Sequence, residues 1–379
     1  MRLTTAGESH GKALVAIIEG LPAHLQIDLD KINTHLAYRQ SGFGRGGRQK
    51  IEKDRAEILT GVRNGETLGS PVTLCIYNKD YENWSNCMSD GACEQEAMAK
   101  KSLTKVRPGH ADLTGVIKFG QTDARNVLER ASARETAIRV AAGGVYRQYL
   151  SSLGVEIGGY VKEVCGVVDN GEYSFADLSK AKTTPVGMIN AEAEQRAEEK
   201  IAELKRAGDT AGGIVEIRVR GLKRGFGSSM TYAEKLDSQL AQALMSIQAV
   251  KGVEIGVGFA VAHTSGKDVH DEIYYDTEKG FYRTTNRAGG IEGGMSNGEE
   301  IILHVAMKPI PTLMKGLQTV DYLTKERVTA ASERSDVCAI FALEIIAEAV
   351  VAQVLADAVD KRLGGDTMQE VKSRYALLP

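Results

Sequence analysis

The sequence predicts an α+β fold in which a central layer of helices lies between antiparallel β-sheets. Segments 126–150 and 338–363 are long, rich in alanine and largely apolar, so we expect two helices that are buried on most sides. Segment 214–220 alternates apolar and polar residues, which is typical of a strand in an antiparallel sheet with one face in water. Such elements pack in layers around a shared core. Since no proline-rich or serine- and glycine-rich linker divides the 379 residues, we expect a single domain over 1–379.

The other strands are expected where short apolar runs lie between turn residues. In chain order these runs are 13–21, 57–62, 72–77, 155–168, 253–261 and 301–307. The pair Asn64-Gly65 between the second and third runs predicts a hairpin turn. Residues 191–207 are rich in Ala, Glu and Lys and follow Asn190, which predicts a solvated surface helix with that residue as its N-cap.

The composition argues against several classes of protein. Its 47 Lys+Arg against 50 Asp+Glu give a formal net charge of -3, so the basic excess of a broad nucleic-acid or membrane surface is missing. The five cysteines contain no C-x-x-C pair, which indicates a reducing cytoplasm rather than a disulfide framework or a zinc site. The first residues lack the apolar stretch of a signal peptide, and acidic residues interrupt segment 337–359. We therefore expect a cytoplasmic protein without a membrane span or a bound metal.

Arginines and histidines lie in glycine- and serine-rich turns that are far apart in the sequence. Arginine binds carboxylate or phosphate through two N–H groups and keeps its proton. We interpret the turns as the walls of one pocket for a ligand with several negative charges. They are residues 7–11, 39–48, 107–112, 130–135 and 333–336.

Two histidines in these turns are candidates for acid–base chemistry. His10 and His110 each stand beside glycine, with Ser9 and Arg107 close by. Pro108 favours an extended conformation of Arg107 and so fixes its direction. A histidine is more often a satisfied core or surface group, and the flanking turns are what favour chemistry at these two.

Residues 42–47 match the Gly-x-Gly-x-x-Gly pattern of dinucleotide-binding proteins, but that pattern requires a strand before it and a helix after it. Residues 28–38 instead have apolar residues at helical spacing. The stretch also resembles an RNA-binding Arg-Gly-Gly box, although such boxes repeat in basic, disordered chains. An arginine-bearing loop is the preferred interpretation.

Arg130 and Arg134 are four residues apart, so we expect them on one helix face near its start, where amides close to Ser132 would add an anion site. The alternative is that they pair with Glu129 or Glu135. Further along, the glycine-rich segment 289–298 and the stiff segment 308–312, with its two prolines, indicate ligand loops of unspecified kind.

Seven of these motifs resemble the chorismate synthase family, and they occur in order from residue 1 to about 363. They are Gly-Glu-Ser-His-Gly at 7–11, Gly-Phe-Gly-Arg-Gly-Gly-Arg at 42–48, Arg-Pro-Gly-His-Ala-Asp at 107–112, Arg-Ala-Ser-Ala-Arg-Glu-Thr-Ala at 130–137, Gly-Gly-Ile-Glu-Gly-Gly-Met-Ser-Asn-Gly at 289–298, Lys-Pro-Ile-Pro-Thr at 308–312 and Glu-Arg-Ser-Asp at 333–336.

The resemblance implies helices sandwiched between antiparallel sheets in a homotetramer. It also implies conversion of 5-enolpyruvylshikimate 3-phosphate to chorismate, the last step of the shikimate pathway for aromatic amino acids, with reduced FMN. Phosphate and the C6 hydrogen leave from opposite faces in an anti-1,4-elimination without net redox change. The substrate carries two carboxylates and a phosphate, which suits the arginine turns. Since the resemblance leaves no room for a reductase domain, a separate flavin reductase is expected to supply the reduced flavin.

The resemblance also implies roles for individual residues. The anions of the substrate would be held by Arg39, Arg45, Arg48, Arg107, Arg134 and Arg334. The flavin would be surrounded by Arg130, Ala131, Ser132, Gln248, Ala249, Gly293, Lys308, Pro309, Ile310, Pro311, Thr312 and Arg334. His10 would protonate the departing phosphate, and His110 would face the reduced flavin. Asp336 would be the base that acts with the flavin N5, and Ser9 and Ser132 are further catalytic candidates.

The chain departs from many relatives at Ile340-Phe341-Ala342, where they have Val-Pro-Ala. We expect the final helix to start differently, which could displace Asp336. Two functions of other classes stay open. A flavin- and NADPH-dependent oxidoreductase would reduce its substrate, and a nucleic-acid-binding protein would bind RNA in a salt-sensitive way.

Overall fold

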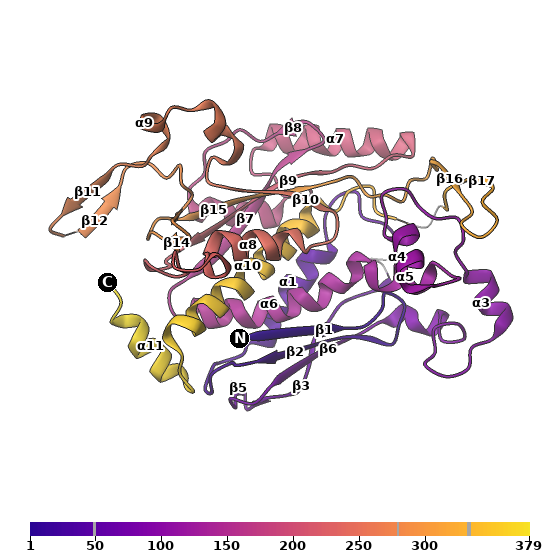
Figure 1. The fold of residues 1–379 in the computed structure, drawn as a ribbon, viewed down its shortest axis with the longest axis horizontal. Helices are drawn as coiled ribbons and strands as arrows, with labels where there is room; N and C mark the ends of the chain where they lie inside the picture. Colours follow the sequence, from indigo (N-terminus) through magenta and orange to yellow (C-terminus); the bar gives the residue numbers. More distant parts are fainter. Residues whose placement is uncertain (48–50, 279, 332–334) are drawn as a thin grey trace.

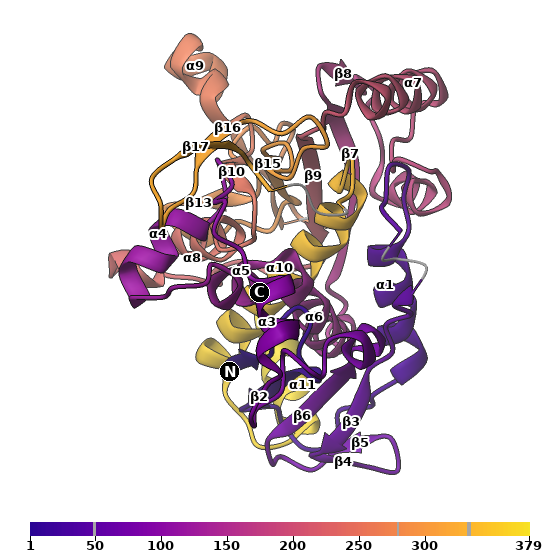
Figure 2. The same cartoon turned by 90° about the vertical axis from the view of Figure 1, so that its right-hand side faces the viewer.

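The fold has two antiparallel sheets with long helices between them, as the sequence predicts (Figures 1 and 2). The helices of this layer are α1 (Leu29–Gln40), α6 (Thr136–Ser151) and α10 (Ile340–Leu363). A single apolar core cluster includes buried residues from both sheets and from these helices. The computed structural model describes residues 1–47, 51–278, 280–331 and 335–379.

The first sheet has four strands in the order β1-β2-β6-β3, and all its pairings are antiparallel. The strands are β1 (Arg2–Ala6), β2 (Ala13–Glu19), β3 (Glu57–Thr60) and β6 (Val72–Tyr77). The expected turn at Asn64-Gly65 is present and joins the short strands β4 (Val62–Arg63) and β5 (Glu66–Thr67). Both turn residues have positive φ, 50° and 77°, as the favoured two-residue hairpin turns require.

The second sheet has five strands in the order β10-β15-β9-β7-β8. They are β7 (Glu156–Val164), β8 (Val167–Val168), β9 (Gly213–Arg220), β10 (Val250–Ile255) and β15 (Ile301–Met307). Along β15 every second residue is buried, so one face packs on the helices. The expectation for 253–261 was wrong in its second half: positive φ at Gly256 and Gly258 ends the strand, and the 3₁₀ segment η5 (Gly258–His263) follows.

Segment 126–150 was expected to be one helix, and this was wrong. Ser132 is extended, with ψ 142°, and separates α5 (Arg125–Ala131) from the 3₁₀ turn η2 (Ala133–Glu135) that leads into α6. Its side chain accepts a hydrogen bond from the backbone N of Arg134, as N-cap residues do. The break gives the chain a new helix start at this point.

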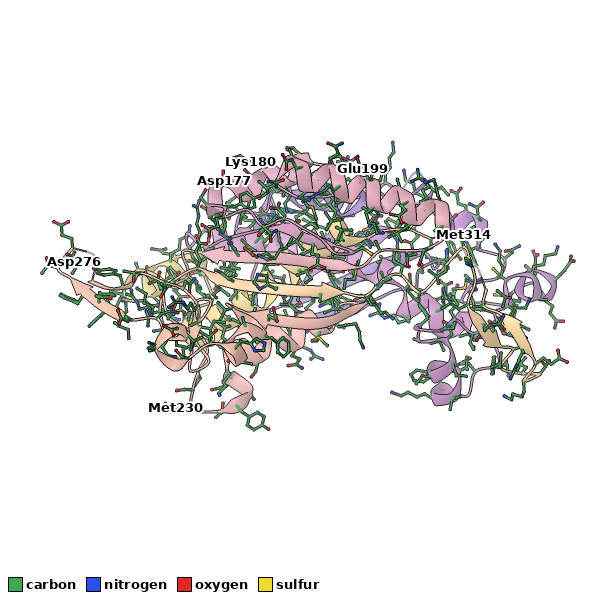
Figure 3. The ribbon with its side chains drawn as sticks, turned by 90° about the horizontal axis from the view of Figure 1, so that it is seen from above. Asp177, Lys180, Glu199, Met230, Asp276 and Met314 are labelled. Carbon is green, nitrogen blue, oxygen red and sulfur yellow. The ribbon has the colours of Figure 1, made fainter. Side chains whose placement is uncertain are left out.

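The remaining elements lie around this sandwich. Helix α7 (Ala191–Ala207) has its predicted bounds, and Asn190 caps it by accepting from Ala193 N at 2.9 Å. Among the described residues, none of the helices has the length and apolar character that crossing a membrane requires. Figure 3 shows the tip of the hairpin β11–β12, labelled at Asp276, projecting from one end of the molecule. Besides α7, the elements around the sandwich are η1 (Lys79–Asn83), α3 (Gln95–Lys101), α4 (Asp112–Phe119), η3 (Phe175–Thr183), η4 (Tyr232–Glu234), α8 (Leu236–Met245), α9 (Gly266–Val269), β11 (Ile273–Asp276), β12 (Gly280–Arg283), β13 (Ile291–Glu292), β14 (Met295–Ser296), β16 (Gln318–Val320), β17 (Arg327–Thr329) and α11 (Met368–Ala376).

Helices α6 and α10 approach each other closely at small residues. A Cβ atom placed on Gly143 would lie 2.3 Å from the Cβ of Ala349 and 2.6 Å from its Cα. Since packed interiors have few voids, an added methyl group must push the two helices apart. The glycine and alanine content that predicted buried helices therefore also sets their spacing.

We expect Gly143→Ala to lower the free energy of unfolding by about 1–3 kcal/mol because it overpacks this contact. The loss should appear although alanine is the better helix former by about 1 kcal/mol. Urea unfolding measures it. The control is Gly91→Ala, whose new methyl would meet only Ser89 Oγ, at 3.8 Å. Equal stability of Gly143→Ala and the wild type would show that the two helices separate without cost.

Candidate active site

Helix α1 ends and helix α6 begins close to α4 and α5 (Figure 1), and several predicted site residues lie on these elements or next to them. Contacts of Arg39, the second-last residue of α1, with Ala133 and Thr136 join these two ends. Asp336 lies just before the start of α10. Helix starts carry unpaired N–H groups and partial positive charge, so this region favours anions.

Arg134 is the most fully bound of the predicted arginines. Its Nη1 donates to both oxygens of Asp54, at 2.7 and 2.6 Å, and its Nε and Nη2 donate to Asn78 Oδ1 at 3.0 and 2.7 Å. Its side chain and that of Asp54 are almost completely buried. Asn78 in turn donates to the carbonyls of Glu8 and Gly11, so this arginine is tied to the turn that carries His10.

Arg39 lies beside it and shares the same carboxylate. Its Nη1 is 3.6 Å from Asp54 Oδ2, and its Nε and Nη2 donate to Thr136 Oγ1. Burial lowers the pKa of the Arg39 guanidinium, and the charge of Asp54 opposes that effect. The residue is part of a helix rather than of an open turn, and the sequence did not reveal this. Glu52 Oε2 also lies 3.8 Å from Arg134 Nη2, so two buried carboxylates accompany the two buried guanidinium groups.

Arg45 and Asp336 connect the glycine-rich loop to the start of α10. Arg45 Nε lies 3.3 Å from Asp336 Oδ2 without hydrogen-bond geometry, and Gly46 N donates to Asp336 Oδ1 at 2.5 Å. Helix α1 precedes the loop, as expected, so a strand–turn–helix of the dinucleotide-binding kind is absent here. Phe341, at the departure from the family pattern, is buried against Gly42 under the same loop. The predicted substrate ligands Arg48 and Arg334 lie outside the described residues.

A second arginine centre forms around Arg107. Its Nε and Nη2 donate to the two oxygens of Asp112 at 2.8 and 3.0 Å, and its Nη1 donates to Thr312 Oγ1 at 3.1 Å. His110 Nδ1 is 2.5 Å from Asp112 Oδ1. Burial would raise the pKa of Asp112, but hydrogen bonds from His110 and Arg107 outweigh it and hold that pKa well below its usual range. Asp112 is therefore an ionised anchor for both neighbours.

The stiff segment 308–312 closes against this centre. Lys308 Nζ donates to the carbonyl of Gly109, and Lys308 N donates to the carbonyl of Ala249 at 3.0 Å. The pKa of Lys308 is lowered by burial and by the charge of Lys251. The segment thus joins the turn of Arg107 to the residues that follow α8.

Arg130 points away from Arg134, so the expectation of a shared helix face was wrong. The break at Ser132 turns the chain, and Arg130 Nη1 and Nη2 donate to the carbonyls of Gly7 and Thr5 at 3.0 and 3.1 Å. Its Nη2 is also 3.8 Å from Glu135, the pairing that the alternative foresaw.

Arg130 and Gln248 line a cavity of about 340 Å³. Gln248 Oε1 is buried there without a hydrogen-bond partner. Gly293 does not lie at this cavity. The carbonyl of its neighbour Gly294 accepts from Leu236 N at the start of α8, whereas Gln248 follows the end of that helix. Ten residues of helix separate these points by about 15 Å. A larger cavity of about 660 Å³, between α1, α6 and β7, contains none of the predicted site residues.

His10 is held by α5 and by the segment after η1. Its Nδ1 is 2.8 and 3.0 Å from the carboxylate oxygens of Glu129, and its ring stacks on Trp84 with centroids 3.9 Å apart. Ser9 is buried, and its backbone N donates to the carbonyl of Glu129 at 2.9 Å. His10 and His110 thus both have a carboxylate on Nδ1.

Sequence reasoning gave no role to the acidic residues that hold the site. Asp112 is the last residue of the turn 107–112, and Glu129 was expected only as an alternative partner for an arginine. No pattern in the sequence marked Asp54 or Asn78, which meet Arg134 through folding alone. Asp112 and Glu129 each lie within five residues of an arginine in the sequence, and this spacing was the signal that could have identified them.

Comparison with known proteins gives a consistent result. A family model described as chorismate synthase matches residues 1–359. The chorismate synthase of Geobacter sulfurreducens is 52% identical over 99% of this chain and 97% of its own length. That of Alkaliphilus metalliredigens is also 52% identical, over 99% of this chain and 98% of its own. A solved structure titled as a crystal structure of chorismate synthase has a TM-score of 0.79 at 38% identity and covers 99% of this chain and 96% of that one.

We expect Asp112→Asn to lower the free energy of unfolding by about 3–5 kcal/mol at pH 7, because it leaves buried Arg107 without its charge partner. The folded-state pKa of Asp112 lies below the unfolded value of about 4, so its contribution is present above that pH and is lost as pH falls toward the folded pKa. The gap between wild type and variant, measured by denaturant unfolding, should therefore narrow progressively below about pH 4. A stability difference between wild type and variant that stays constant or widens below pH 4 would contradict an ionised Asp112.

Proposed function

The chain belongs to the chorismate synthase family, and we propose that it converts 5-enolpyruvylshikimate 3-phosphate to chorismate with reduced FMN at the site described above. Membership makes it a lyase of the final step of the shikimate pathway, which supplies aromatic amino acids. The observation that carries the proposal for this site is that buried Arg39 and Arg134 share one carboxylate beside the start of α6.

The substrate's two carboxylates and phosphate would bind to the arginines. Arg39 and Arg134 are rigid, since each makes several hydrogen bonds, so their direction is set before any ligand arrives. Arg45 Nε lies 3.3 Å from Asp336 Oδ2, so Arg45 is held near the start of α10, where we propose that its guanidinium binds an anion of the substrate. Arg107 would add a fourth cation, and Arg48 and Arg334 are proposed to complete the set.

Two of the proposed flavin residues, Arg130 and Gln248, line the smaller cavity. The unpartnered Gln248 Oε1 can accept from an N–H of the ring system, and Arg130 provides a cation at the same opening. When bound, reduced FMN would supply an electron-rich ring whose N5 can take up the C6 proton, without net redox change. The proposed flavin residues are Arg130, Ala131, Ser132, Gln248, Ala249, Lys308, Pro309, Ile310, Pro311, Thr312 and Arg334. Gly293 is proposed from the family pattern, and it does not line this cavity.

The acid–base roles follow from which atoms stay available. His10 and His110 each have Nδ1 beside a carboxylate, which leaves Nε2 to face ligands. We assign His10 Nε2 to protonate the departing phosphate and His110 to contact the flavin. Asp336, held by Gly46 N, is assigned as the base at C6. Ser9 and Ser132 are proposed to orient the His10 turn and the α6 start.

Several wider properties are part of the proposal. The chain would act as one domain, a view that the core cluster shared by both sheets supports. A homotetramer would cover exposed aromatic side chains such as Tyr275 and Phe281 on the projecting hairpin. The five cysteines are free thiols, in keeping with the cytoplasm. A separate reductase would supply reduced flavin, since helix α1 rather than a strand precedes the glycine-rich loop.

The reaction is tested in an anaerobic assay with substrate and chemically reduced FMN. We expect phosphate and chorismate in equal amounts, and no product with oxidised FMN or with FMN and NADPH alone. Alanine at His10, His110 or Asp336 should lower the rate by about 10²–10⁴ through loss of proton transfer. Turnover with oxidised flavin and no reductant would contradict the proposal, as would near-normal rates in both histidine variants.

We also expect FMN and substrate to strengthen each other's binding, because substrate bound to the arginines would order the loop of residues 42–47 over the flavin and exclude water. The affinity for FMN should rise about 5–150-fold at saturating substrate, the usual size of such coupling. Titration of flavin fluorescence with and without substrate measures this, and inorganic phosphate in place of substrate is the control. Arg45→Ala should reduce the coupling, and equal flavin affinity in both titrations would argue for separate sites.

A further inference from the structure

We propose that Glu129 is a positioning residue for His10: it holds the imidazole with its proton on Nδ1 and so presents Nε2 to the substrate. This inference rests on the proposed role of His10 as the acid that protonates the leaving phosphate. Glu129 itself would contact neither substrate nor flavin.

Glu129 fixes His10 to α5 through its carboxylate and its backbone carbonyl. Glu129 Oε2 accepts from the backbone N of His10 at 2.7 Å, and Oε1 lies 2.8 Å from the ring Nδ1. The backbone carbonyl of Glu129 accepts from Ser9 N at 2.9 Å. The backbone and the ring of His10 are therefore held together, which leaves the side chain little freedom to rotate.

The charge state of Glu129 agrees with this geometry. Its side chain is 1% exposed. Burial raises the pKa of Glu129, but hydrogen bonds from His10 outweigh that effect and lower it. An ionised carboxylate has no proton to give, so the proton between it and Nδ1 belongs to the ring.

The opposite side of the ring is where a ligand can approach. Nε2 is 4.0 Å from Asp80 Oδ2, beyond hydrogen-bond distance. Trp84 covers one ring face at an interplanar angle of 22°, so a ligand cannot approach from that face. In the proposed step the ring starts as the imidazolium, with a proton on each nitrogen. The N–H bond at Nε2 breaks, the electron pair stays on Nε2, the proton goes to an oxygen of the leaving phosphate, and the neutral ring keeps its proton on Nδ1. Glu129 stays ionised throughout, and its charge is shared between the protonated ring and Arg125, whose Nη1 lies 3.5 Å from Oε1.

Glutamine at this position separates positioning from simple packing. It has almost the same shape but only one acceptor oxygen. If that oxygen takes the place of Oε2 and accepts from His10 N, the amide NH₂ takes the place of Oε1, 2.8 Å from Nδ1. Its donation to Nδ1 favours a neutral ring with the proton on Nε2, against the oxygen, which lies 3.0 Å from Nδ1. Glu129→Gln should therefore reverse the tautomer without removing the side chain.

The experiment combines kinetics with ¹⁵N NMR of histidine-labelled protein, in which His10→Gln identifies the His10 resonances. We expect Nδ1 of His10 to carry the proton in the wild type at alkaline pH, and Nε2 to carry it in Glu129→Gln. The variant should have kcat lowered about 10–100-fold, the usual effect of losing an outer-shell partner. Its affinity for FMN should stay unchanged, because Glu129 lies on the His10 side of the site.

The matched control is Glu66→Gln. Glu66 also meets a histidine at Nδ1, that of His24 at 3.0 Å, but both side chains are exposed and outside the proposed site. It should leave kcat and the His10 resonances unchanged. A wild-type protein with the proton on Nε2, or a Glu129→Gln variant with normal kcat, would overturn the inference. If Glu129→Gln fails to fold, the wild-type spectrum still decides. An inactive wild type with the expected tautomer would instead refute the proposed function alone.

Discussion

The pairing of buried arginines with buried carboxylates is the constraint on which the rest of the site depends. A guanidinium taken out of water without a partner would be strongly destabilising, so each cation needs its own network before any ligand binds. Arg134 satisfies this through Asp54 and Asn78, and Arg107 through Asp112. These pairings draw the first sheet, the end of α1 and the start of α6 into one place.

The same pairings leave the site ready for an anion. Asp54 serves both Arg39 and Arg134, and Glu52 lies 3.8 Å from Arg134, so the two guanidinium groups are held in place by buried carboxylates before a ligand arrives. The starts of α6 and α10 add partial positive charge that needs no counterion of its own. Because these groups are already oriented and dehydrated, an anionic ligand would gain attraction without first ordering flexible side chains.

The two histidines show a repeated arrangement on unrelated turns. His10 meets Glu129 and His110 meets Asp112, in both cases at Nδ1. A carboxylate on one ring nitrogen fixes the tautomer and the ring orientation, so chemistry is left to the other nitrogen. The acidic residues therefore matter as much to the site as the basic residues that dominate its motifs.

The sequence by itself determined the layers, most strand positions, the cap of α7 at Asn190 and the family, since periodicity, turn residues and local motifs express short-range physics. It also predicted Arg39, Arg107, Arg134, His10 and His110 as site residues. Only the tertiary structure decided what holds them. The extended Ser132 splits a segment whose composition predicts one helix, and it sends Arg130 and Arg134 to different partners. Asp54 lies 80 residues from Arg134 in the chain. No local pattern encodes such a pair, because its energy arises only when folding excludes water from both charges.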